Sequence, residues 1–97
     1  VEGLVRLMAS DYREPLNLGT DRLVTINELV DIVAKIAGKK ISKRHDLTKP
    51  QGVRGRNSDN SRLRTVLGWE PQIALEQGLA ITYPWIAAQV AEATRAR

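Results

Sequence analysis

Cysteine and phenylalanine are absent from this sequence of 97 residues, which contains only two tryptophans and two tyrosines. The absence of cysteine excludes disulfide bonds, thiolate metal sites and a cysteine nucleophile within the chain. It also fits a reducing compartment, so we expect a cytoplasmic protein. Because aromatic residues are scarce, any hydrophobic core must consist mainly of leucine, isoleucine, valine and alanine.

Several signatures of a free-standing enzyme are also missing. His45 is the only histidine, so no histidine-based metal site or triad can be assembled, and we interpret it as a surface residue. Neither Tyr12 nor Tyr83 is followed by a lysine four positions later. There is no Gly-x-Gly-x-x-Gly after a strand and no P-loop. We therefore expect no catalytic residue, no bound cofactor and no metal within these residues.

No segment approaches the roughly 20 apolar residues of a membrane span, and we expect no membrane partner. The sequence has no initiator methionine and opens within an amphipathic pattern, "VEGLVRLM". Hydrophobic residues make up 42% of the chain, which is enough for one modest core. We expect residues 1–97 to be a single fragment domain of a larger protein.

Positive charge is concentrated in the middle of the chain. The formal net charge is +4, but residues 39–64 contain nine lysines and arginines against two aspartates. This stretch carries +7 and the remainder −3. The asymmetry predicts an anionic partner, and it does not distinguish phosphate, nucleic acid and acidic protein.

The hydrophobic pattern predicts four helices. Residues 1–9 have apolar side chains at helical spacing. The clearest helix follows a capping box of Thr25 and Glu28 and stops at Gly38, with Asp31 and Lys35 expected to pair on its outer side. The third is expected to be capped by Ser58 and Asp59 and to end before Gly68. The fourth begins near Leu75, with a kink or break expected at Pro84.

Extended structure is predicted in two places. Leu16–Leu18 forms a short apolar run closed by Gly19, and Lys39–Leu47 alternates weakly around Ile41. Short apolar runs bounded by turn residues are typical of strands. The predicted fold class is therefore α/β, in the form of a mostly helical α+β fragment.

The stretch "QGVRGRNSDN", residues 51–60, is the candidate functional motif. Gly52 and Gly55 allow a close approach of the backbone to a ligand or a positive φ. The planar guanidinium groups of Arg54 and Arg56 suit bidentate contacts to phosphate oxygens. The N-terminus of the following helix would add free N–H groups. A solvated turn explains the same residues equally well, so the residues alone leave both interpretations open.

Beyond this pattern, "GVRGRNSDNSRLRTVLGWEPQIALEQGLAITYPWI" resembles the C-terminal part of the nucleotide-sugar epimerases and dehydratases of the extended short-chain dehydrogenase/reductase superfamily. The earlier "VEGLVRLMASDYREPLNLGTDRLVTINELVDIVAKIAGKK" matches in the same register. The "LGW-P" portion is specific only to the superfamily. The narrower "GVRGRNSDN" is similar to the GDP-mannose 3,5-epimerase family.

The resemblance implies roles for three residues of the motif, and it implies that the cofactor site and the catalytic residues lie outside this chain. It implies that Arg56 binds the diphosphate of a GDP-hexose, that Arg54 supports the loop or interacts more weakly, and that Asp59 caps a helix. It further implies that the NAD site and the Tyr-x-x-x-Lys pair of the full-length family lie outside this chain, which alone is expected to be inactive. Residues 1–20 would complete a Rossmann domain, and residues 21–97 would form the substrate-binding lobe, without the Rossmann core.

Two other classes of function are compatible with the sequence. The loop "GVRG", Gly52 to Gly55, matches the Gly-x-x-Gly loop of KH domains, so a small nucleic-acid-binding module is an alternative. It is disfavoured because the basic stretch has no aromatic residues for base stacking. The other alternative is a structural fragment that associates with itself. Its exposed apolar helix face and unpaired strand would favour a homodimer or a swapped oligomer.

Overall fold

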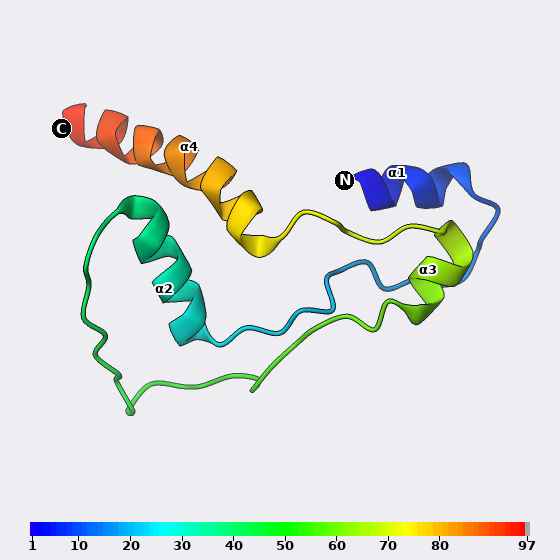
Figure 1. Ribbon diagram of the computed structural model, residues 1–97, viewed down its shortest axis with the longest axis horizontal. Coiled ribbons are helices and arrows are strands. Elements are labelled where there is room, and N and C mark those ends of the chain that lie inside the picture. The colour runs from blue at the N-terminus through cyan, green and yellow to red at the C-terminus, as the bar shows by residue number, and fades with distance from the viewer. Residues whose placement is uncertain (97) are drawn as a thin grey trace. The chain divides into compact units, whose positions relative to one another are not determined.

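The computed structural model describes residues 1–96, and these form helices joined by irregular chain (Figure 1). The four helices of the described residues are α1 (Glu2–Ala9), α2 (Ile26–Ala37), α3 (Ser61–Leu67) and α4 (Leu75–Arg95). Their positions agree with the four helices predicted from the sequence, so the mostly helical character is confirmed. Within residues 1–96, no helix is both long and apolar enough to cross a membrane.

The two predicted strands, Leu16–Leu18 and Lys39–Leu47, are wrong for the described residues, which contain no strand. A strand is stabilised by a ladder of hydrogen bonds to a neighbour. Near the first segment, the N–H of Ser58 donates to the carbonyl of Thr20 at 2.9 Å, but this is one bond and not a ladder. The predicted helices of the α/β fragment are therefore present in residues 1–96, and its predicted strands are not.

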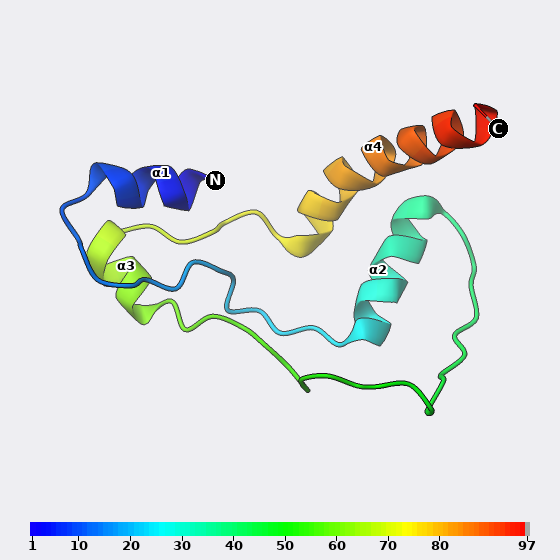
Figure 2. The same cartoon turned by 180° about the vertical axis from the view of Figure 1, so that it is seen from behind.

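The described chain divides into two compact units. The first consists of Val1–Leu23 with Gln51–Gln72 and contains α1 and α3; the second consists of Val24–Pro50 with the chain from Ile73 onward and contains α2 and α4. In the first unit, the chain that leaves α3 at Gly68 returns beside α1 (Figures 1 and 2). The ring of Trp69 there covers Gly3, with the guanidinium of Arg6 5.5 Å from the ring centroid.

Burial in the first unit is limited. Leu63 of α3 is fully buried and is the one large apolar side chain with this property among residues 1–96. The apolar face of α1, in contrast, lies in solvent, although its amphipathic pattern was predicted correctly. Leu4, Val5 and Met8 are all exposed, Met8 by 86%.

In α3, the first turn is organised by a carboxylate that precedes the helix. Asp59 accepts hydrogen bonds from the hydroxyl of Ser61 at 2.7 Å and from its N–H at 3.0 Å. The hydroxyl contributes most and the N–H less, and together they hold the pKa of Asp59 below its ordinary value. Asp46 repeats this arrangement with Thr48, and its pKa is lowered for the same reason. Asp59 thus accepts the first N–H of α3, as expected of a residue that supports the helix start, but the N-cap itself is Asn60, whose side chain makes no cap hydrogen bond. The predicted cap by Ser58 is wrong, because its hydroxyl has no partner in residues 1–96.

The second unit is held by α2 and α4, which lie against each other. Thr25 accepts from the N–H of Glu28 at 3.0 Å, and Gly38 ends α2 with a φ of 67°, so both predicted caps are confirmed. Asp31 pairs with Lys43 at 2.6 Å, whereas the sequence had paired it with Lys35. The loop after α2 therefore folds back onto the helix.

Pro84 does not break α4, which continues from Leu75 to Arg95. The predicted break is therefore wrong, and the alternative of a kink at Pro84 stays a prediction. Gln77 supports the start of this helix by accepting from the N–H of Ala74 at 3.1 Å. This contact offsets the missing side-chain acceptor of Ala74.

Replacing Gly3 with alanine should destabilise the first unit by about 1 kcal/mol or more, because overpacking outweighs the better helix propensity of alanine. A Cβ at this position would lie 2.9 Å from Cζ3 of Trp69 and 3.2 Å from Cδ2 of Leu18. Thermal unfolding followed by tryptophan fluorescence measures the effect. The control is Gly78→Ala in α4, where the nearest atom lies at 3.8 Å and alanine should stabilise by roughly 0.5–1 kcal/mol. Equal stabilisation by both variants would contradict the packing of Trp69 on Gly3.

The Ser61→Ala variant should raise the pKa of Asp59 toward its ordinary value of 3.8, because the hydroxyl of Ser61 is the main cause of its lowering. Since the folded-state pKa is depressed, the stabilisation is present above the unfolded-state pKa and is lost as the pH falls through the folded value. An NMR titration of the carboxyl carbons measures both aspartates. Asp46, which depends on Thr48, is the internal control and should not move. If the pKa of Asp59 is already ordinary before substitution, the two hydrogen bonds from Ser61 to Asp59 are refuted.

Candidate functional site

Arg54 and Arg56 lie in the irregular chain between α2 and α3, and both are exposed. Gly52 has a φ of 69°, so the positive φ anticipated from the sequence occurs there. Gly55 serves close packing instead, because a Cβ on it would lie 3.3 Å from Cδ1 of Leu23. Within the part of the chain that the structure describes, neither arginine has a hydrogen bond or ion pair.

A pocket of about 590 Å³ opens beside one of the two arginines. Its lining comes from the segment before α2 and the segment before α3, and consists of Asn17, Leu18, Gly19, Thr20, Arg56, Asn57 and Ser58. Arg54 is not part of this lining. The sequence offered both arginines as candidates for phosphate contacts, whereas the structure gives only Arg56 a place in the pocket.

Three successive carbonyl groups hold the chain that follows Arg56. The side-chain amide of Asn57 donates to the carbonyl of Asp21 at 2.9 Å. The N–H of Ser58 donates to Thr20 at 2.9 Å, and the side-chain amide of Asn60 donates to Gly19 at 2.9 Å. We call these three bonds the carbonyl clamp. They fix the pocket wall immediately after Arg56.

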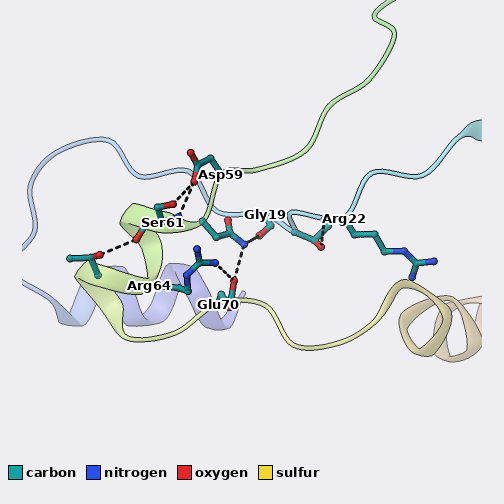
Figure 3. A network of polar contacts seen from close by, with 9 residues as sticks. Gly19, Arg22, Asp59, Ser61, Arg64 and Glu70 are labelled. Carbon is teal, nitrogen blue, oxygen red and sulfur yellow. Dashed lines mark hydrogen bonds and ion pairs between the residues drawn. The ribbon is translucent and has the colours of Figure 1, made fainter.

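Asn60 links the carbonyl clamp to α3 and the turn after it. It is 3% exposed, and its amide nitrogen also lies 3.4 Å from Oε2 of Glu70. The same carboxylate oxygen accepts from Nη1 of Arg64 at 3.0 Å. Figure 3 shows Gly19, Arg64 and Glu70 meeting around this amide. Nη1 of Arg64 is therefore paired with Glu70, so part of its positive charge is already neutralised within the unit.

The N-terminus of α3 does not contribute to an anion site in the way the sequence suggested. The N–H of Ser61 is bonded to the carboxylate of Asp59, which also places a negative charge there. An incoming phosphate would be repelled from that position. The positive charge beside the 590 Å³ pocket comes from the side chain of Arg56.

Sequence reasoning missed the polar residues that complete this pocket. Asn17 comes from the segment that had been predicted as a strand, and it also lines a neighbouring pocket of about 550 Å³ with Asp59 and Arg62. Ser58 was expected only to cap a helix, but its hydroxyl is buried without a hydrogen-bond partner in residues 1–96. The run "NSDN" consists of residue types whose short polar side chains often bond to backbone groups, but the sequence does not indicate which distant carbonyls Asn57 and Asn60 reach.

The structure does not support a functional site at the other candidates, which are His45 and the Gly52 to Gly55 loop. His45 is exposed and lies 3.0 Å from the side-chain oxygen of Asn27, which agrees with a surface residue. In residues 1–96 no group of three or more histidine, aspartate or glutamate residues could hold a metal ion. The Gly52 to Gly55 loop does not join two helices directly, because α2 ends at Ala37 and α3 begins at Ser61. This arrangement does not favour the KH-type alternative.

Comparison with known proteins supports the resemblance seen in the sequence. No family model matches the chain. A GDP-mannose 3,5-epimerase of Arabidopsis thaliana is 48% identical over 90 residues, which are 93% of this chain and 24% of that protein. GDP-mannose 3,5-epimerase 1 of Oryza sativa subsp. indica is 44% identical over the same shares. GDP-L-fucose synthase 1 of Arabidopsis thaliana is 39% identical over 74% of this chain and 22% of that protein.

The chain thus spans about a quarter of the length of the curated relatives that it matches. A UDP-glucuronic acid decarboxylase of Arabidopsis thaliana is similar at 36% identity over 84% of the chain, so the relatives share names that refer to nucleotide sugars and differ in reaction. Identity is highest to the epimerases among these. Over 93% of its residues, this chain is a sequence relative of the GDP-mannose 3,5-epimerases.

Proposed function

We propose that this chain is the C-terminal, sugar-nucleotide-binding part of an NAD-dependent epimerase similar to GDP-mannose 3,5-epimerase, and that Arg56 binds the diphosphate of a GDP-hexose. The observation that carries the proposal is the exposed guanidinium of Arg56 beside a pocket of about 590 Å³ with both polar and apolar lining residues, and this guanidinium has no ion pair in residues 1–96. It lies within the stretch that is similar to the epimerases.

The chemistry of the pocket suits a sugar diphosphate. The fork of an arginine side chain makes two parallel, charge-assisted hydrogen bonds to phosphate oxygens. Asn17 adds an uncharged side-chain amide to the lining, with donors and acceptors of the kind that hydroxyl groups of a sugar require. Arg54 lies outside the lining, and in this proposal it attracts the anion over a longer distance or supports the loop.

The proposal assigns no contact with NAD to this chain. Binding of a dinucleotide pyrophosphate by a Rossmann unit requires a strand, a glycine-rich turn and a helix N-terminus in succession. Residues 1–96 contain no such succession, because they contain no strand. The residues present do not fit the cofactor, so the proposed oxidation and proton exchange belong to other parts of a longer protein. The chain alone is therefore proposed to bind substrate without turnover, and in the cytoplasm.

We also propose a partner surface for the exposed apolar side chains of α1. Leu4, Val5 and Met8 form an apolar face on α1 that is exposed to solvent. Residues 1–20, which carry this face, are proposed to complete a Rossmann domain, and residues 21–97 to form the substrate lobe. When the chain is isolated, we propose that the α1 face associates with a second copy, because apolar surface of this kind is unfavourable in water.

Substituting Arg56 with alanine should weaken the binding of GDP-mannose to the chain by roughly 10- to 100-fold, which corresponds to one or two charge-assisted hydrogen bonds. Isothermal titration calorimetry at physiological salt measures the affinity. Arg54→Ala should have a smaller effect. Arg44→Ala is the matched control, since Arg44 is an exposed arginine of the same basic stretch in the second unit, and it should leave the affinity unchanged.

Equal losses for Arg44→Ala and Arg56→Ala would mean that the anion is held by general positive charge, and the site assignment would fail. Tighter, salt-dependent binding of single-stranded RNA than of GDP-mannose, with Arg54 and Arg56 both required, would favour the nucleic-acid alternative instead.

Sedimentation velocity of the isolated chain should show a homodimer or larger oligomer at micromolar concentration. Val5→Glu should shift the distribution toward monomer, because it places a charge in the exposed apolar face of α1. Lys49→Glu is the control, since it makes a larger change of charge at an exposed position of the irregular chain between α2 and α3. A monomer at high concentration before substitution would exclude self-association through α1.

A further inference from the structure

We infer that Asn57 and Asn60 are positioning residues for Arg56: through the carbonyl clamp they hold the arginine loop against residues 19–21 before a ligand arrives. The part of this inference that concerns ligand affinity rests on the proposed function of Arg56. The inference does not require either asparagine to contact the ligand.

The geometry assigns the loop's position to the carbonyl clamp. Residues 51–60 contain no helix or strand, so no secondary structure fixes the backbone of Arg56. The first bond of the clamp begins one residue later, at Asn57, and spans 36 positions to Asp21. The last bond spans 41 positions, from Asn60 to Gly19. Together they fix an irregular segment on the C-terminal side of the arginine.

The chemistry of the asparagine side chain explains why this residue type is used twice. A main-chain carbonyl requires a donor, and the neutral amide supplies N–H groups without bringing a charge. An aspartate in its place would present an oxygen to the carbonyl oxygen and repel it. For Asn60 this demand is strict, because it is 3% exposed and its amide also faces Glu70. A buried polar group that loses its partner is costly.

The consequence for binding is preorganisation. A guanidinium on a free loop would lose conformational freedom on binding a diphosphate, and each immobilised residue reduces the affinity. The carbonyl clamp fixes part of that loop during folding instead. Gly55 adds to this from the other side of Arg56, because its backbone lies close to the side chain of Leu23. The arginine is thus flanked by two fixed points.

Asn57 provides the test, because it is exposed and its loss should not unfold the chain, whereas substitution of the buried Asn60 could. Asn57→Ala should speed hydrogen exchange of the Ser58 amide, measured by NMR, since that amide donates to the next carbonyl of the clamp. It should also weaken GDP-mannose binding by about five-fold, the effect of one lost hydrogen bond. Asn57→Asp should do the same. Asn27→Ala removes an exposed, hydrogen-bonded asparagine of the second unit and should change neither measurement.

A double-mutant cycle separates positioning from direct contact. If Asn57 acts through Arg56, Asn57→Ala weakens binding in the chain with Arg56 and has no further effect in the Arg56→Ala variant. Equal weakening in both backgrounds would overturn the inference, since Asn57 would then contact the ligand itself. Unchanged exchange at Ser58 would overturn it as well, independently of any ligand. If Arg56→Ala alone has no effect, the proposed function fails together with the role of the clamp in binding, and the exchange data still report whether the clamp exists.

Discussion

The carbonyl groups of Gly19, Thr20 and Asp21 are the fixed points on which the first unit depends. Hydrophobic burial provides little else there, because Leu63 is the one fully buried large apolar side chain in residues 1–96, and such a side chain contributes about 1.5–3 kcal/mol. The hydrogen bonds to the three carbonyls decide instead where the segment before α3 lies. The location of Arg56 beside its pocket follows from that pairing and not from secondary structure.

The shortage of burial also explains the character of the surface. Met8 on α1 and Trp85 on α4 are 86% and 65% exposed, although large apolar side chains are usually covered in stable domains. Matched relatives are about four times as long as the chain. Under the proposed function, the apolar helix faces and the guanidinium of Arg56, which has no partner in the described residues, have one common explanation: other parts of a longer protein or its substrate would contact them.

The helices could be predicted from the sequence because their limits are set by neighbouring residues. Thr25 and Gly38 act within four positions of α2, and Gly68 ends α3 with a φ of 57°. The strands failed because a strand depends on a partner elsewhere in space. The motif around Arg56 could be identified as an anion-site candidate, but the roles of Asn57 and Asn60 could not. Those roles depend on carbonyl groups 36 and 41 positions away.

The division of the first unit into two separated segments determines the order of assembly. Its halves are interrupted by Val24–Pro50, so the carbonyl of Gly19 cannot be bonded until Asn60 has been synthesised. At a synthesis rate of about 5–20 residues per second, the 41 positions between them correspond to roughly 2–8 s. Throughout that interval the carbonyls of residues 19–21 are hydrated. The wall of the pocket beside Arg56 is consequently formed only with long-range closure of the chain.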